Sequence, residues 1–160
     1  MASVVIAPVE DEGARAAAYA LRVEVFVHEQ AVPPDLELDD LDESADHVLA
    51  LVDGQAVATG RLVVEDPGYS GTDPGLGPVA HLGRICVRAD QRGTGLGAAI
   101  VRALEERAAD RGLRVASLGA QTRAIEFYER LGYVAHGPEF DDAGIPHRHM
   151  TRRLDEDHRR

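Results

Sequence analysis

The segment His47–Val64 constrains the fold more than any other part of this sequence, because it has the pattern of a β-hairpin. Two runs of mainly apolar residues flank Asp53-Gly54, a dipeptide typical of the two-residue turn that joins antiparallel strands. An antiparallel pair in the middle of the chain excludes a sheet in which every strand is parallel to its neighbours. We therefore expect a mixed sheet.

Strands and helices alternate in the rest of the chain. Apolar residues recur at helical spacing in three segments, which are Glu12–Glu29, Ala98–Arg111 and Thr122–Leu131. Further strands are expected at Ser3–Ala7, His81–Val87, Val115–Leu118, Tyr133–His136 and His147–Leu154, with loops at 66–78 and Pro138–Pro146. The order β-α-β-β-β-α-β-α-β-β predicts an α/β domain (α+β in the wider sense) around a mixed sheet.

The length of 160 residues suits one domain with a core of its own. No linker, repeat or change of composition interrupts it, so we expect a single domain over residues 1–154 and a polar tail over 155–160. The lone Cys86 excludes an internal disulfide and is typical of a reducing compartment. There is no run of 18 apolar residues and no signal-peptide pattern, so we expect a cytoplasmic protein that does not span a membrane.

The charge balance excludes some partners and some chemistry. A formal net charge of −11 argues against binding to nucleic acid or to an anionic membrane surface. All 17 basic residues are arginine, so no lysine can act as a Schiff base or a general base.

The stretch Gly93–Ala98 matches the dinucleotide-binding pattern G-x-G-x-x-[GA]. A Rossmann site also requires a strand directly before the glycines and a carboxylate at the end of the next strand. Here the polar segment 88–92 intervenes, and the next strand ends in Leu118–Gln121 without a carboxylate. The loop also follows three strands of antiparallel type rather than one. These observations argue against a Rossmann fold.

Phosphate binding nevertheless remains the best interpretation of this stretch. Gly93, Gly95 and Gly97 let backbone N–H groups face a ligand without hindrance from a Cβ atom. The helix that follows adds a partial positive charge at its N-terminus, and Arg88 and Arg92 contribute full charges nearby. The sequence therefore predicts a loop that binds a phosphate-bearing ligand.

Two motifs resemble those of the GNAT N-acetyltransferases. The strand Leu82–Val87, followed by Arg92-x-x-Gly95-x-Gly97 and an amphipathic helix, resembles the acetyl-CoA signature of that family. The later segment Ala124–Tyr133 is similar to its second signature, and residues 22–30 and 144–150 extend the resemblance to the ElaA-type (YjcF-like) branch. The resemblance implies the GNAT acyl-CoA N-acyltransferase fold, which is a mixed, mostly antiparallel sheet flanked by helices.

Acetyl-CoA is the co-substrate that this resemblance implies. In the family, the loop and the helix N-terminus hold the diphosphate, and the preceding strand is splayed from its neighbour and pairs with the pantetheine amides. The corresponding cofactor-binding residues are Ile85, Cys86, Val87, Arg92, Gly93, Thr94, Gly95, Leu96, Gly97, Ala98 and Gln121. The family commonly has Asn near the start of the following helix, where this chain has Thr122-Arg123.

Acetyl transfer to an amine requires an acid for the leaving thiolate and a base for the amine. The resemblance implies that Tyr128 is the acid, although a tyrosine that only packs its helix against the sheet would show the same pattern. His147 and Glu29 are candidates for the base, followed by Asp141 or Asp142, and ordered water is an alternative to all of them.

Two other kinds of chemistry are not expected. A covalent acetyl group on Cys86 is unexpected because a lone cysteine in an apolar strand is usually an inert core residue. The seven histidines are scattered along the chain, so no metal site is expected.

Taken together, the motifs predict an N-acetyltransferase that transfers the acetyl group of acetyl-CoA to a primary amine by direct transfer in a ternary complex. Two alternatives stay open, a non-catalytic CoA-binding or sensing module of the same fold and an acyltransferase of signal synthesis. The expected acceptor is a small-molecule or peptide amine, and a homodimer is allowed as the assembly. Seven carboxylates in residues 35–46 form either a solvated loop or a surface that attracts a cationic amine.

Overall fold

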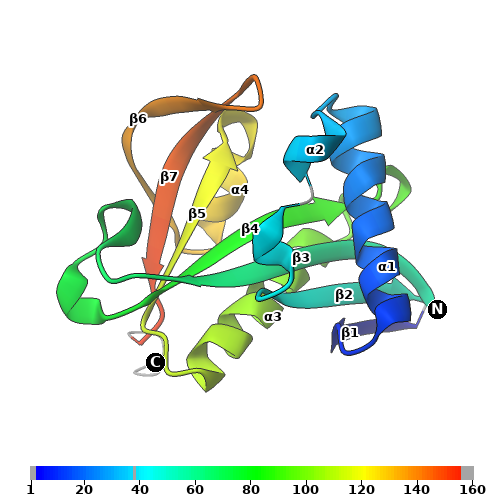
Figure 1. Cartoon of the computed structure of the whole chain (residues 1–160), viewed down its shortest axis with the longest axis horizontal. Helices are drawn as coiled ribbons and strands as arrows, with labels where there is room; N and C mark the ends of the chain where they lie inside the picture. Colours follow the sequence, from blue (N-terminus) through cyan, green and yellow to red (C-terminus); the bar gives the residue numbers. More distant parts are fainter. Residues whose placement is uncertain (1–2, 38, 156–160) are drawn as a thin grey trace. The chain divides into compact units, whose positions relative to one another are not determined.

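The computed structural model describes residues 3–37 and 39–155 and has the α/β order expected from the sequence (Figure 1). Its strands are β1 Val4–Pro8, β2 Asp46–Val52, β3 Gln55–Glu65, β4 Val79–Val87, β5 Val115–Gln121, β6 Val134–Asp142 and β7 Ile145–Arg153. Its α-helices are α1 Glu12–Arg22, α2 Pro34–Glu37, α3 Leu96–Asp110 and α4 Ile125–Arg130, and a π-helical segment, Val23–Glu29, continues α1. Residues 156–160 of the predicted tail lie outside the described part of the chain. None of the described helices is both long enough and apolar enough to cross a membrane.

The strands follow the order β1-β2-β3-β4-β5-β7-β6 in one sheet. Strands β4 and β5 pair in parallel, and antiparallel ladders join β1 to β2, β2 to β3, β5 to β7 and β6 to β7. The predicted mixed, mostly antiparallel sheet is therefore confirmed. The chain divides into two units, Met1–Val63 with Arg84–Leu104 and Val64–Gly83 with Glu105–Arg160. The expected single domain over residues 1–154 stays a prediction.

The hairpin that β2 and β3 form is the one expected from Asp53-Gly54. Asp53 and Gly54 have φ angles of 51° and 83°, and Val52 pairs with Gln55 across the turn. Positive φ at both central residues is the mark of the type I′ turn, whose twist matches that of the flanking strands. The hairpin prediction is confirmed, including its turn.

In the first unit, α1 covers one face of the strands, and Figure 1 shows it crossing β2 and β3. A buried cluster joins apolar residues of the helix, its π-helical continuation, β2 and β4, namely Ala18, Leu21, Val25, Leu49 and Cys86. This cluster uses the apolar face that the helical spacing predicted.

The N-terminal part of α3 packs on the other face of β3, so closely that Gly60 has no room for a side chain. A Cβ atom at Gly60 would lie 2.7 Å from Ile100 Cγ2 and 2.9 Å from Leu104 Cδ1. Side chains alternate across a strand, so Gly60 and its neighbour Thr59, which pairs with Leu49, face opposite sides. The first unit is therefore a layer of strands between two helices.

The predicted helix Glu12–Glu29 forms over its whole length, but its last seven residues have the wider π-helical winding. The N–H of Gln30 donates to the carbonyl of Val25 at 3.0 Å, a bond that spans five residues instead of four. Such π-helical turns occur frequently at functional sites, and this one ends at Glu29, one of the candidate bases.

The β6–β7 hairpin corrects one prediction. The expected loop at Pro138–Pro146 is wrong, because strand structure occupies most of it and only Ala143-Gly144 turns the chain. Pro138 lacks the N–H that a ladder uses, and the pairing is interrupted between His136 and Phe140. A bulge thus accommodates the proline within a long hairpin, and the sequence pattern does not distinguish this from a loop.

Candidate functional site

The glycine loop before α3 has the backbone geometry of an anion-binding site. Gly93 and Gly95 have φ angles of 79° and 86°, a region that residues with a Cβ atom rarely adopt. Among the described residues, no atom lies within 4 Å of a Cβ built on either glycine, so the backbone conformation rather than a lack of space requires them. The N–H of Ala99 bonds to the carbonyl of Gly95 at 3.1 Å, and α3 begins at Leu96, two residues before the predicted start. The N–H groups of residues 96–98 precede the helical bonding and can bind an anion.

Two arginines, Arg88 and Arg92, precede this loop, and each is paired with a carboxylate. Arg92 Nη1 and Nη2 donate to the two carboxylate oxygens of Glu29 at 2.5 and 2.7 Å, while Nε donates to the carbonyl of Val87 at 3.0 Å. Arg88 donates to both carboxylate oxygens of Asp90, at 2.6 and 2.9 Å. The sequence predicted two added positive charges at the loop, and the structure shows that a carboxylate balances each of them.

Strand β4 carries a kink in its second half. Among the described residues, its ladder with β5 consists of two pairs, at Ala80 and His81. Arg84 has a φ of 51°, which is uncommon for a residue other than glycine and turns the next peptide group out of line. The backbone groups of Ile85–Val87 therefore follow a kink. That this part of the strand is splayed and binds a cofactor stays a prediction.

Cys86 lies on this part of β4 and is buried in the apolar cluster that α1 forms with the strands. Burial raises the pKa of its thiol to about 12. Because the thiolate is the nucleophilic form of cysteine, a thiol with this pKa is inert near neutral pH. The structure thus supports the expectation that Cys86 is not a nucleophile.

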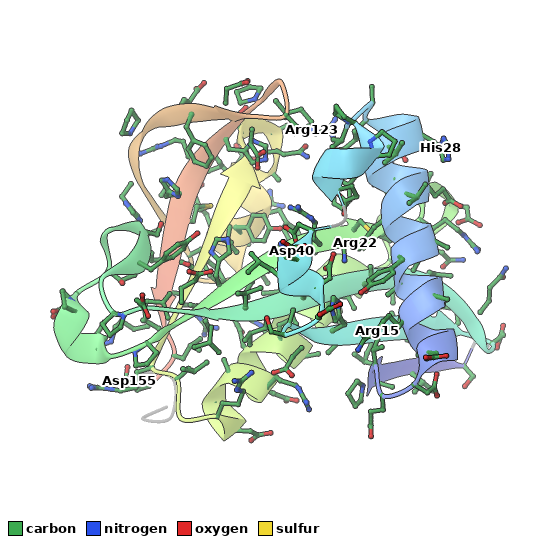
Figure 2. All side chains as sticks on the ribbon, viewed as in Figure 1. Arg15, Arg22, His28, Asp40, Arg123 and Asp155 are labelled. Atoms are coloured by element: carbon green, nitrogen blue, oxygen red, sulfur yellow. The ribbon has the colours of Figure 1, made fainter. Side chains whose placement is uncertain are left out.

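A network of buried charges, which the sequence analysis did not predict, joins the acidic segment (residues 35–46) to α1 and β3 of the first unit. Arg22 is fully buried and donates to Glu37 Oε2 at 2.7 Å and to Asp42 Oδ1 at 2.6 Å. Arg61 of β3 donates to the same Asp42 oxygen at 2.8 Å and to Asp39 Oδ1 at 2.7 Å. Figure 2 shows Arg22 on the side of α1 that faces the turn around Asp40. Two arginines therefore share the carboxylates of one short segment.

Two carboxylates of the acidic segment are not solvated, in contrast to one of the two interpretations of this segment. Glu37 and Asp42 are only 3% and 4% exposed. Burial alone would raise the pKa of the Asp42 carboxyl, but hydrogen bonds from Arg22, from the Asp39 N–H and from Arg61 lower this pKa to about 2. Asp42 is therefore ionised, and its charge is paired with Arg22 and Arg61. The solvated interpretation is wrong for these two carboxylates.

Tyr128, the predicted acid, lies in α4 of the second unit and is half-buried. Its ring meets those of Phe127 and Tyr133 edge to face, with centroids 4.9 and 6.1 Å apart. Burial raises the pKa of its hydroxyl to about 12. Within the described residues, that hydroxyl makes no hydrogen bond, whereas the Tyr133 hydroxyl donates to Glu105 at 2.8 Å. Tyr128 thus keeps its proton at neutral pH and has a donor to offer.

His147, the first candidate base, is buried in β7 with its ring stacked on Phe140 at 5.7 Å. Its Nδ1 lies 2.7 Å from the carbonyl oxygen of Ile145. A carbonyl oxygen only accepts, so Nδ1 carries a proton, and in the neutral ring Nε2 is the nitrogen with the lone pair. This is the tautomer that a base requires. His147 pairs across the β5–β7 ladder with Gln121, a predicted cofactor contact.

Comparison with known proteins assigns the chain to a family. A family model described as an acetyltransferase (GNAT) domain matches residues 6–154. The chain belongs to the GNAT acetyltransferase family. Over 136 residues, covering 84% of this chain and 89% of the relative, it is 40% identical to YjcF of Bacillus subtilis (strain 168), an uncharacterized N-acetyltransferase.

Two crystal structures resemble this GNAT acetyltransferase over nearly their whole length, each covering 95% of this chain and 99% of its own. A candidate N-acetyltransferase from Lactobacillus plantarum is 31% identical with a TM-score of 0.79. Escherichia coli ElaA is 23% identical with a TM-score of 0.74, which is a likeness of fold. The match to YjcF confirms the predicted YjcF-like resemblance within the GNAT family.

This GNAT acetyltransferase distributes its candidate residues over its two units. The first unit holds Ile85, Cys86, Val87, the loop Arg92–Ala98 and Glu29, and the second holds Gln121, Tyr128 and His147. Within the first unit, the structure joins Glu29 to Arg92 of the loop. Within the second, it places Gln121 beside His147, and it leaves Asp141 and Asp142 exposed near the β6–β7 turn.

Sequence reasoning missed the kink at Arg84 and the buried network. Arg84 donates through Nε to the carbonyl of Glu37 at 3.1 Å, so the kinked strand and the acidic segment are tied together. One signal for the network was available, because Arg22 and Arg61 interrupt apolar runs at positions that face the core. A buried charge requires a partner, and the acidic segment holds the carboxylates that can pair with these arginines.

Proposed function

We propose that this protein is an N-acetyltransferase that transfers the acetyl group of acetyl-CoA to a primary amine of a small-molecule or peptide acceptor, by direct transfer in a ternary complex. The observation that carries the proposal is the loop before α3, in which two left-handed glycines present backbone N–H groups at a helix N-terminus. A diphosphate is the type of ligand that such a loop binds, and membership of the GNAT family makes an acyl-CoA its source.

The residues of the chain suit an acyl-CoA. N–H groups of residues 96–98 would hold the diphosphate, and the backbone of Ile85–Val87, after the kink at Arg84, would bond the pantetheine arm and polarise the thioester carbonyl. Gln121, whose Oε1 accepts from Arg123 at 2.9 Å, would add a contact near the start of the helical turn that follows β5.

The chemistry requires one proton acceptor and one proton donor. Acetyl-CoA supplies a thioester whose C–S bond breaks as the amine nitrogen bonds to the acetyl carbon. His147 suits the base because its Nε2 has a lone pair, and Tyr128 suits the donor to sulfur because its hydroxyl is protonated. Glu29 is the weaker candidate, since Arg92 holds both of its carboxylate oxygens. The inert thiol of Cys86 supports direct transfer.

Calorimetric titration with acetyl-CoA tests the first half of the proposal. We expect binding in the micromolar range, followed by release of CoA when a panel of primary amines is added. Lack of binding at high micromolar acetyl-CoA would refute the proposal. Binding without turnover on any amine would instead favour the sensing module, and a preference for long acyl chains would favour signal synthesis.

Substituting Gly95 with alanine tests the role of the loop. Alanine disfavours the φ of 86° by about 1–2 kcal/mol, so the N–H groups should turn away and acetyl-CoA affinity should fall about tenfold. Gly112→Ala is the matched control, because Gly112 has a φ of 75° and equally open surroundings but follows the C-terminal end of α3 in the second unit, outside the loop. Equal affinity losses in the two variants would show that strain, and not the loop, is being measured.

A further inference from the structure

Glu29 occupies the face of Arg92 that a phosphate would use. The Nε of Arg92 is anchored on the carbonyl of Val87, and the two Nη atoms both point to the Glu29 carboxylate. Carboxylate and phosphate are recognised by the same bidentate fork of an arginine. The Glu29 carboxylate and a diphosphate oxygen pair are therefore alternatives for the same two donors.

The Arg92–Glu29 pair is exposed to solvent, so replacing Glu29 by a phosphate at Arg92 costs little free energy. The side chains of Arg92 and Glu29 are 42% and 40% exposed, and ion pairs of this exposure contribute little to stability. Arg88 does not supply an unpaired positive charge in place of Arg92, because Asp90 holds its guanidinium in a bidentate pair. Near the glycine loop, Glu29 thus cancels the arginine charge that the signature motif supplies.

We propose that Glu29 sets the affinity of the loop for the diphosphate of CoA by competing for Arg92. This inference rests on the proposed function, since it assumes that CoA is the ligand. With Glu29 present, an arriving diphosphate exchanges one anion for another at Arg92 and gains no net charge pairing. The affinity is therefore held down, and CoA leaves sooner after each turnover. This role differs from that of a base, because it acts on binding and not on the amine.

The test is Glu29→Gln, which removes the charge and keeps the shape. Calorimetric titration with CoA at low salt should show a dissociation constant about three- to tenfold lower than in the wild type. The gain should shrink as salt is added, because an exposed charge is screened. Glu12→Gln is the matched control, since it removes an equal charge at an exposed position in the first turn of α1, and it should bind CoA like the wild type.

A double-mutant cycle with Arg92→Gln makes the result specific. If competition is the mechanism, Glu29→Gln has no effect on CoA affinity when Arg92 is already glutamine. Unchanged or weaker binding by the single Glu29→Gln variant, with wild-type binding intact, overturns the inference and leaves the proposed function standing. A wild-type protein that does not bind CoA at all instead removes the proposed function. A Glu29→Gln variant with normal affinity but collapsed turnover overturns the inference in favour of Glu29 as base.

Discussion

Replacing Arg22 with methionine is expected to lower the free energy of unfolding by about 3–5 kcal/mol. Arg22 is fully buried and donates to both Glu37 and Asp42. Methionine retains part of the volume but leaves two buried carboxylates without this partner. The cost arises because Glu37 and Asp42 stay buried and each loses one arginine partner, although Arg84 and Arg61 still pair with them. Breaking a buried ion pair in this way costs more than removing the whole group.

Urea unfolding followed by circular dichroism measures this loss. Arg15→Met is the matched control, because Arg15 lies exposed on the same helix (Figure 2) and should change stability by no more than about 0.5 kcal/mol. In an Asp42→Asn background, one of the stranded charges is already gone, so Arg22→Met should cost less there. A loss below about 1 kcal/mol in the wild-type background would contradict the prediction.

Removing the hydroxyl of Tyr128 is expected to lower turnover about 100-fold while leaving acetyl-CoA affinity unchanged. General acids contribute about 10²–10⁴ in rate, and the lower end applies here. The pKa of Tyr128, raised to about 12 by burial, lies above that of an ordinary thiol at about 8.5. The phenol therefore stays protonated and can donate a hydrogen bond to the leaving sulfur, but it is a reluctant source of a full proton. The measurement is kcat of Tyr128→Phe with a competent amine.

Tyr133→Phe is the natural comparison for this variant. The ring of Tyr133 is next to that of Tyr128, but its hydroxyl donates to the buried Glu105. Loss of that bond should cost about 1–3 kcal/mol in stability with little change in kcat of the folded protein. Wild-type turnover by Tyr128→Phe would mean that Tyr128 only packs its helix, the alternative that its sequence pattern left open.

Local signals in the sequence predicted most of the fold. Asp53-Gly54 specifies its turn through two positive φ angles, which few other residue pairs tolerate. The glycine loop was predictable for the same reason, because Gly93 and Gly95 both have positive φ. Where a backbone conformation tolerates only a few residue types, a single sequence is enough to predict that conformation.

The remaining features depend on contacts between distant segments. Nothing in the residue type of Arg84 indicates a left-handed φ, and its conformation accompanies a tie to Glu37, 47 positions earlier in the chain. The partners of Arg92 were equally invisible, since Glu29 is 63 residues away in sequence. The pattern around Pro138 does not distinguish a loop from a bulge, because a proline interrupts the hydrogen bonds of a ladder in both. Ion pairs between residues far apart in sequence become visible only in the structure, because no local pattern specifies the partner.

Cys86 gives the chain a built-in reporter of local opening. It is the single thiol of the sequence, packed beneath α1 with Leu21 and Val25. A thiol-specific label therefore reaches it only when this helix lifts from β4, so the labelling rate measures the free energy of that opening. Comparing this value with the free energy of global unfolding shows whether the first unit opens alone or only together with the thiol-free second unit.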